Sequence, residues 1–386
     1  MKKLLIVFIS LLLIYWVATM IVPSTIEKGS NPVKNLPPYE VSEEALALFN
    51  SFEFVADLHC DALLWGRDLT EKSDYGHVDF PRMQEGNVAF EVFTIVSKSP
   101  KGQNMEINSA NTQDNITLLN IAQGRPISNW FSLMNRTLYQ SKKLEEFGND
   151  FNGQFIFIKS KDDLNNLIEA RKTNKKVIGG LLGIEGAHAL EGKLDNVEKA
   201  YEAGVRLIGP MHFFDNELGG SAHGMSGDGL TDFGKQVIKR MNELNMIIDL
   251  AHVSPKMYDD ILNYSEKPVM VSHTGIRAVV NSPRNLSDDQ VKRLAEKGGI
   301  IGIAFFDMVV GEDEIKGIVS SIKRVKNLVG VEHVALGSDY DGNVAVPFDI
   351  TGFPLIVEAL LQEGFNEEEI RAIMGENVKR FLFENF

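Results

Sequence analysis

The sequence contains a single cysteine, Cys60, in 386 residues. One cysteine excludes a disulfide within the chain and a structural zinc site built from cysteine thiolates. Basic residues are also scarce, because 39 lysines and arginines stand against 53 aspartates and glutamates and leave a net charge of −14. A chain this acidic is poorly suited to the phosphate backbone, so we expect no nucleic acid among its partners.

Several catalytic motifs are missing as well. The sequence has no His-Glu-x-x-His, which excludes a zincin-type protease, and no Gly-x-Ser-x-Gly, which argues against a serine hydrolase. No glycine-rich phosphate turn follows the first predicted strand, as an open doubly wound nucleotide-binding sheet would require. That open sheet is therefore only the second choice of fold.

One long hydrophobic run is present, at the N-terminus. Lys2 and Lys3 precede an uncharged apolar stretch over residues 4–22, which as a helix is about as long as a hydrocarbon core is thick. We expect residues 1–22 to be an uncleaved membrane anchor of an exported protein, with a cleaved signal peptide as the alternative. Residues 23–41 are rich in proline, serine, asparagine and glycine and are predicted to form a linker.

Residues 42–386 are predicted to form one α/β domain, a (β/α)8 TIM-like barrel. Short apolar strands alternate with helical segments, and near-continuous apolar runs are typical of strands that are buried on both faces. The eight strands are predicted at residues 55–61, 88–96, 177–184, 206–212, 246–250, 268–272, 300–306 and 333–337. Residues 97–176 are predicted to be mostly helical.

The first strand ends in an unusual group of polar residues. Alternation along a strand places Asp57, His59 and Asp61 on one face and Cys60 on the other. Two carboxylates and an imidazole at the end of an apolar strand are unfavourable unless a positive charge lies among them. Histidine nitrogen and aspartate oxygen both suit zinc, so the pattern indicates a metal site.

Other predicted strands also end in, or lead to, titratable residues, namely Glu185, His212, His252, His273 and Asp339. In a barrel these positions share one rim, which is where active sites are built. So many polar groups on one rim are hard to explain by stability alone.

This set of residues suits two metal ions better than one. His59, Asp61 and Glu185 could hold one ion, because each offers a nitrogen or oxygen ligand. The same Glu185 could hold the second ion together with His252 and His273. Two such ions can share a water and lower its pKa toward neutrality, which provides a metal-bridging hydroxide. Asp339 is placed to take the proton of that water.

Six stretches carry a resemblance to a known family. They are Asp57-Leu58-His59-Cys60-Asp61, Leu182-Gly183-Ile184-Glu185-Gly186-Ala187-His188, Asp249-Leu250-Ala251-His252-Val253-Ser254, Val271-Ser272-His273, Ser282-Pro283-Arg284-Asn285 and Gly337-Ser338-Asp339-Tyr340-Asp341-Gly342. Together and in this order they resemble the membrane dipeptidase family, the renal dipeptidase-like zinc peptidases (M19) related to the metal-dependent amidohydrolases. The resemblance covers nearly the whole chain from Phe52 onward.

The resemblance implies a zinc dipeptidase that acts through a metal-bridging hydroxide, with two Zn²⁺ ions per chain bridged by Glu185. It implies that His212 faces the scissile carbonyl and steadies the oxyanion. Arg284 would bind the C-terminal carboxylate of the dipeptide, a role that suits the two parallel hydrogen bonds of a guanidinium. Asp339 would pass a proton to the departing amine. The family resemblance also suggests a homodimer.

Two positions depart from the family pattern. The family usually has asparagine between the first histidine and aspartate, where this chain has Cys60, whose side chain is expected to point away from the metals. Many members carry tyrosine at the end of strand seven, where this chain has Phe306 and therefore lacks a hydroxyl.

Two alternative functions are left open by the sequence. One is hydrolysis of another amide on the same metals, by an N-acyl amino acid deacylase or a cyclic amidohydrolase. The other is a catalytically silent barrel that serves as a surface binding protein.

Overall fold

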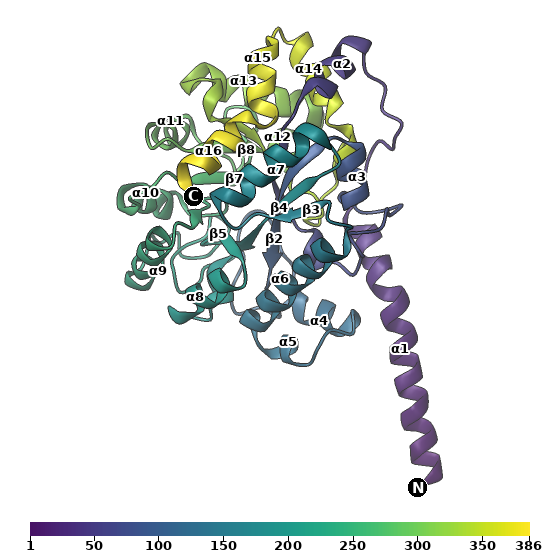
Figure 1. The fold of residues 1–386 in the computed structure, drawn as a ribbon. Helices are drawn as coiled ribbons and strands as arrows, with labels where there is room; N and C mark the ends of the chain where they lie inside the picture. The colour runs from purple at the N-terminus through teal and green to yellow at the C-terminus, as the bar shows by residue number, and fades with distance from the viewer.

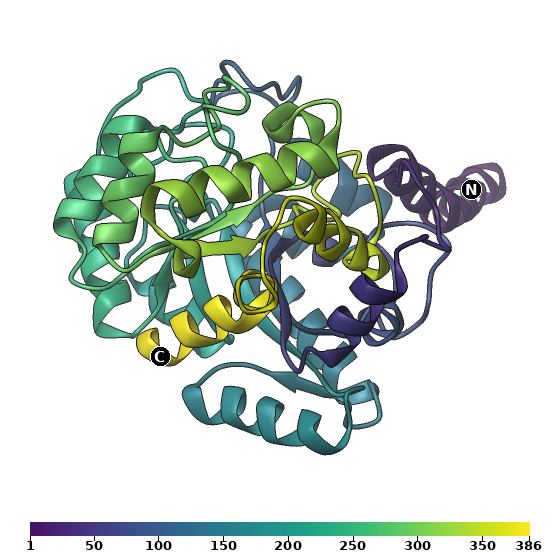
Figure 2. The ribbon, with the colours of Figure 1, turned by 90° about the horizontal axis from the view of Figure 1, so that it is seen from above.

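The body of the protein is a ring of parallel strands surrounded by helices, and a long N-terminal helix projects from it (Figure 1). The computed structural model describes residues 1–386. Seen from above, the helices encircle the strands and the N-terminal helix lies to one side (Figure 2).

The strands of the ring follow one another in chain order and are all parallel. They are β1 (Val55–Cys60), β2 (Val88–Val96), β4 (Ile178–Glu185), β5 (Val205–Gly209), β6 (Ile247–Ile248), β7 (Met270–Thr274), β8 (Ile300–Ile303) and β9 (Val334–Leu336). Bridges between Asp249 and Met270 and between Cys60 and Tyr340 join the two sheets and close the ring. The predicted eight-stranded barrel is confirmed, and every residue of these strands is buried, as strands covered on both faces require.

The helices cover the outside of the ring and line its rim. They are α2 (Glu43–Ser51), α3 (Phe80–Glu85), α4 (Asn115–Ala122), α5 (Ser128–Phe131), α6 (Leu133–Asp150), α7 (Lys161–Thr173), α8 (Asp195–Glu202), α9 (Asp232–Glu243), α10 (Pro255–Tyr264), α11 (Asp288–Glu296), α12 (Asp307–Val310), α13 (Glu314–Val329), α14 (Pro354–Gln362), α15 (Glu367–Arg371) and α16 (Asn377–Asn385). Capping residues that are visible in the sequence mark where several of these helices begin. Ser42 caps α2, and Ser287 with Gln290 forms a capping box at α11.

A short strand outside the ring was not predicted. β3 (Phe155–Phe157) pairs with the beginning of β4, in the region that the sequence indicated to be mostly helical. Only three residues long, β3 gives too short an apolar run for periodicity to separate it from the helices on either side.

Helix α1 (Lys2–Ser30) continues through Pro23, beyond the end predicted at residue 22. Pro23 and Glu27 are buried against the body, so tertiary contacts sustain the helix where local propensity would end it. The predicted linker therefore shortens to residues 31–41, which we call the strap. The strap lies against the loop after β9, where Val33 bridges to Val346 and the Lys34 amide donates to the carbonyl oxygen of Val346 at 2.9 Å.

Candidate metal centre

The sequence-predicted metal ligands meet at the carboxyl-terminal rim of the barrel. His59 lies in β1, Glu185 is the last residue of β4, and His273 lies in β7. Asp61, His212, His252 and Asp339 lie in the loops that follow β1, β5, β6 and β9. All seven side chains are largely buried, and parallel strands bring them together because their carboxyl ends point the same way.

Glu185 lies at the centre of this group. Its Oε1 is 3.1 Å from His252 Nε2, 3.4 Å from His273 Nε2 and 3.6 Å from His59 Nε2. Its Oε2 is 3.3 Å from His212 Nε2. One carboxylate therefore contacts four imidazole rings that come from four different strands or the loops that follow them.

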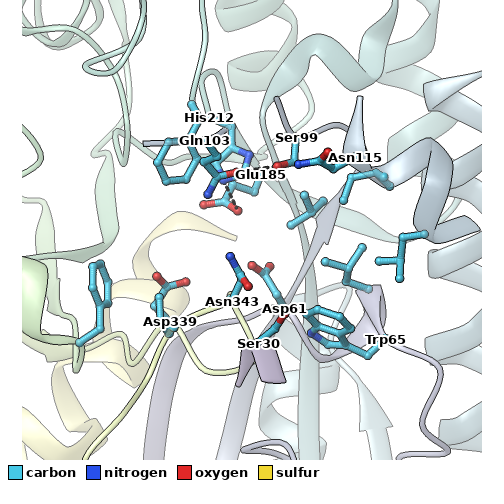
Figure 3. Close-up of a pocket in the computed structure, with 18 of the residues that line it drawn as sticks. Ser30, Asp61, Trp65, Ser99, Gln103, Asn115, Glu185, His212, Asp339 and Asn343 are labelled. Carbon is cyan, nitrogen blue, oxygen red and sulfur yellow. Dashed lines mark hydrogen bonds and ion pairs between the residues drawn. The ribbon is translucent and has the colours of Figure 1, made fainter. Parts of the chain in front are cut away.

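Two further carboxylates complete the group from the other side. Asp61 Oδ1 lies 3.6 Å from His59 Nε2, and Asp339 Oδ1 lies 3.8 Å from the same nitrogen. Figure 3 shows Asp61 and Asp339 facing Glu185 and His212 across the cavity. Three sets of side chains have their ligand atoms close enough to hold a metal ion, namely His59 with Asp61 and Glu185, Glu185 with His212 and His252, and His59 with His273 and Asp339.

The spacing of these atoms fits metal ligands. Zinc bonds of 2.0–2.1 Å in a tetrahedral site place neighbouring ligand atoms about 3.3 Å apart. His252 Nε2 and His273 Nε2 are 3.1 Å apart, and each lies 3.1–3.4 Å from Glu185 Oε1. A close pair of imidazole nitrogens beside a buried carboxylate is what a shared cation would hold together.

A single hydroxyl sets the orientation of two of the histidine rings. Ser272 Oγ donates to Asp249 Oδ2 at 2.6 Å, which uses its only proton. The same oxygen lies 3.2 Å from His59 Nδ1 and 2.9 Å from His273 Nδ1, so both rings donate to it from Nδ1. In the neutral form of each ring this leaves Nε2 bare and directed at Glu185, the tautomer that metal binding needs. A Cβ at Gly302 or Gly337 would overlap the Ser272 carbonyl oxygen, so both positions require glycine.

Other supporting residues were not recognised in the sequence. Thr94 of β2 donates to Asp61 Oδ1 at 2.6 Å, which orients that carboxylate. Asp57, which shares the strand face with His59, does not join the ligands and instead accepts a hydrogen bond from the Ser338 amide at 2.7 Å. Asp57 therefore fixes the loop that carries Asp339. Strand alternation identified Asp57 as polar and inward-facing, but its partner lies 281 residues away.

At His59 the neighbouring carboxylates of Glu185, Asp61 and Asp339 together outweigh burial and raise the pKa to about 10. Burial dominates at four other groups. It raises the pKa of Asp339 to about 7 and that of Glu185 well above its ordinary value. It lowers the pKa of His252 and of His273 well below the usual range. All four groups are thus shifted toward their neutral forms, and a divalent cation would reverse the shift of the carboxylates by supplying the opposite charge.

The backbone at two of these positions adopts a left-handed conformation. His252 has φ 64° and Asp339 has φ 65°, which are uncommon for residues with a side chain. Such conformations are unfavourable in isolation and are retained at sites where the surrounding structure imposes them. The fold therefore gives up some stability to aim these two side chains into the rim.

A cavity of about 730 Å³ opens above the ligands. Asp61, Glu185, His212, His252 and Asp339 border it, and Arg284 reaches it from the segment after β7. Arg284 Nη2 donates to the His273 carbonyl oxygen at 2.6 Å, while its buried Nε has no partner within the protein. Much of the remaining wall is apolar and includes Trp65 and Phe306.

Comparison with known proteins agrees with this architecture. A family model described as membrane dipeptidase (peptidase family M19) matches residues 43–385. A dipeptidase, tcpJ, from Claviceps purpurea is 29% identical over 318 residues, which are 80% of this chain and 69% of that protein. A protein from the pqqA 5′ region of Klebsiella pneumoniae is 31% identical over 223 residues, which are 54% of this chain and 82% of that protein.

Solved structures share the fold at lower identity. The probable dipeptidase PvdM from Pseudomonas aeruginosa has a TM-score of 0.73 at 19% identity and covers 89% of this chain and 97% of its own. A metallopeptidase from Rhodobacter sphaeroides, solved with a phosphinate mimic of the dipeptide L-Ala-D-Ala, has a TM-score of 0.69 at 24% identity, with coverage of 87% and 100%.

Proposed function

Because the chain belongs to the membrane dipeptidase family and is therefore a metal-dependent dipeptidase, we propose that it hydrolyses dipeptides with two zinc ions that Glu185 bridges. The observation that carries this proposal is the position of the Glu185 carboxylate, within 3.1–3.6 Å of the Nε2 atoms of His59, His252 and His273. A carboxylate with two oxygens is suited to bind two ions at once.

The ligands divide into two sets around Glu185. His59 and Asp61 would hold one ion with it, and His252 and His273 would hold the other. When bound, the ions would polarise the peptide carbonyl and lower the pKa of an attacking water. Neighbouring hydroxyls hold ligands of both sets in place, because Ser272 orients one histidine of each set, His59 and His273, and Thr94 orients Asp61.

Arg284 binds the substrate carboxylate in this proposal. Its side chain is buried at the cavity wall, and its unpartnered Nε–H leaves a donor for a ligand. A guanidinium that pairs with a terminal carboxylate fixes the distance from that carboxylate to the bond to be cut. Arg284 therefore restricts the reaction to very short peptides.

His212 and Asp339 act on the scissile bond. Burial lowers the pKa of His212 to about 3, so the ring is neutral and can donate an N–H to the developing oxyanion. Its Nδ1 has no partner within the protein. Burial raises the pKa of Asp339 to about 7, which suits a carboxylate that takes a proton from the attacking water and gives it to the departing amine.

A metal count combined with dipeptide hydrolysis tests the proposal. Glu185→Gln keeps the shape of the side chain but offers one oxygen and an N–H₂ group, so both bound zinc and hydrolysis should be lost. Glu91→Gln is the matched control, because Glu91 is also buried in the barrel but forms no hydrogen bond or ion pair with the proposed ligands. Wild-type protein that binds no zinc, or a Glu185→Gln variant that retains both properties, would contradict the proposal.

Substrate class is tested with a panel. Dipeptides, N-acyl amino acids and cyclic amides separate the dipeptidase from the alternative amide hydrolases. Faster hydrolysis of either alternative than of any dipeptide would assign the site to that reaction. The silent binding barrel is set aside, because the chain is a member of a metallo-dipeptidase family and has the complete set of candidate ligands.

Helix α1 anchors the exported body in this proposal. Its window of mean hydropathy 2.7 is long enough to cross a membrane, and none of that window is buried in the protein. The last turns are packed into the body, with Glu27 bonded to Arg67, so removal of the whole helix as a signal peptide would expose buried groups. The homodimer suggested by family resemblance stays a prediction.

A further inference from the structure

One surface segment beside α1 is unusually poor in charge. Residues 115–135, which contain α4 and α5, include a single ionisable side chain, Arg125. Arg125 is buried and donates to the carbonyl oxygen of Leu64 at 2.6 Å, so it contributes no charge to the surface. Surface segments of exported domains are normally rich in charged residues, so this one calls for an explanation.

The same segment exposes large apolar side chains. Leu118 is 52% exposed, Ile127 is 65% exposed and Phe131 is 84% exposed. Apolar side chains that gather on an uncharged surface mark a contact with another apolar phase.

The segment packs against the apolar part of α1. Tyr15 Oη donates to the Ile121 carbonyl oxygen at 2.8 Å, and Gly124 lies beside Thr19. Figure 1 shows α4 and α5 at the lower end of the body, with α1 running down past α4. The exposed apolar surface of α1 therefore adjoins α4, which in turn packs against α5.

Depth along α1 then places the segment in the bilayer. Tyr15 lies inside the apolar stretch of residues 4–22, about 10 Å along the helix axis from Val22 at 1.5 Å per residue. If residues 4–22 span the hydrocarbon, the partner of Tyr15 lies about 10 Å below its outer edge. Helices that lie in a membrane interface bury their apolar face to a depth of about 5–10 Å, which is similar to the depth of the partner of Tyr15.

We propose that residues 115–135 insert into the outer leaflet beside α1, with lipid chains covering Leu118, Ile127 and Phe131. This inference rests on the proposed anchoring by α1. It also places the mouth of the active-site cavity at the membrane surface, because Ile26 and Ser30 of α1 and Leu118 and Leu119 of α4 line that cavity.

Lipid quenching of the full chain in phosphatidylcholine vesicles tests the inference. Single cysteines introduced as Phe131→Cys, Ile9→Cys and Leu46→Cys are labelled with an environment-sensitive fluorophore, and unlabelled Cys60 does not interfere because it is fully buried. Leu46 is the control, since it is an exposed apolar residue of α2, at the opposite end of the body (Figure 1). Each variant should retain dipeptide hydrolysis, because none of the three residues borders the cavity.

We expect brominated lipid to reduce the emission at positions 131 and 9 about twofold or more and to leave position 46 unchanged. Quenching at position 9 without quenching at position 131 would overturn the inference while the anchor stands. No quenching at position 9 would overturn the anchor itself and the inference with it. A blue-shifted but unquenched label at position 131 would show that protein, such as a second copy of this chain, covers the patch, and would also overturn the inference.

Discussion

The guanidinium of Arg67 donates to the carboxylate of Glu27, and this pair ties the N-terminal helix to the barrel. Arg67 also donates to Asp341 Oδ2 at 2.6 Å and to the Val78 carbonyl oxygen at 2.7 Å. Asp341 follows Asp339 by two residues, so the helix is connected to the loop that carries the proposed proton shuttle. Helix α1 is therefore a structural part of the enzyme and not only an appendage.

Breaking this pair should destabilise the body. Burial raises the pKa of Glu27 to about 7, against the attraction of Arg67, so the carboxylate is ionised at about pH 8. Glu27→Ala should then lower the free energy of unfolding by about 3 kcal/mol, because it leaves a buried guanidinium partly unpaired. Denaturant titration in detergent measures the change.

The neighbouring residue provides the control. Lys28 reaches Asp74 at 3.7 Å, and both side chains are more than half exposed. Lys28→Ala should cost less than about 1 kcal/mol, since exposed pairs are screened by water. Equal losses in the free energy of unfolding for the two substitutions would show that the buried pair stabilises the protein no more than the exposed one.

Ser272→Ala should weaken metal binding without unfolding the barrel. The change removes the hydroxyl that fixes the rings of His59 and His273, and loss of such a partner lowers metal affinity about 10- to 100-fold. Titration of zinc against a competing chelator measures this affinity. Ser321→Ala is the matched control for Ser272→Ala, since Ser321 is also buried but its hydroxyl has no partner. An unchanged zinc affinity for Ser272→Ala would show that Ser272 does not hold the ligand histidines in place.

Arg284→Lys should separate charge from geometry. Lysine keeps the positive charge but loses the two parallel donors, so kcat/KM for dipeptides should fall about 10- to 100-fold. Hydrolysis of the corresponding dipeptide amides should change little, because they lack the carboxylate. Arg277→Lys on the same segment is the control, since Arg277 does not border the cavity. Equal losses for acids and amides would assign Arg284 a structural role.

Acid should destabilise the protein partly through His77. Burial lowers the pKa of His77 to about 4, and its Nδ1 accepts a hydrogen bond from the Asp341 amide at 2.8 Å, which needs the neutral ring. The folded pKa lies below the ordinary 6.5, so this stability is present above pH 6.5 and is lost as the pH falls toward 4. Between pH 7 and about pH 5 the loss should be about 2 kcal/mol. His77→Gln should flatten that part of the stability profile, and an unchanged profile would contradict the assignment.

Most of the candidate ligands on the rim could be predicted from the sequence. The residues that orient those ligands could not. Polar residues that end apolar strands mark a shared edge, because parallel strands must end together, and this placed His59, Glu185 and His273 in one group. That Ser272 contacts two rings depends on the register of β1 against β7, which no local pattern encodes. The same limit applies to α1, where contacts of Glu27 outweigh the usual effect of Pro23.

The strap joins the two ends of the chain, and this has a consequence for the order of folding. Residues 32–35 form hydrogen bonds with residues 346 and 347, so this early segment finds that partner only when synthesis is nearly complete. A contact between such distant segments forms slowly, because the chain loses the entropy of closing a long loop before any hydrogen bond stabilises the contact. The strap must therefore stay unpaired until synthesis reaches residues 346 and 347, about forty residues before residue 386.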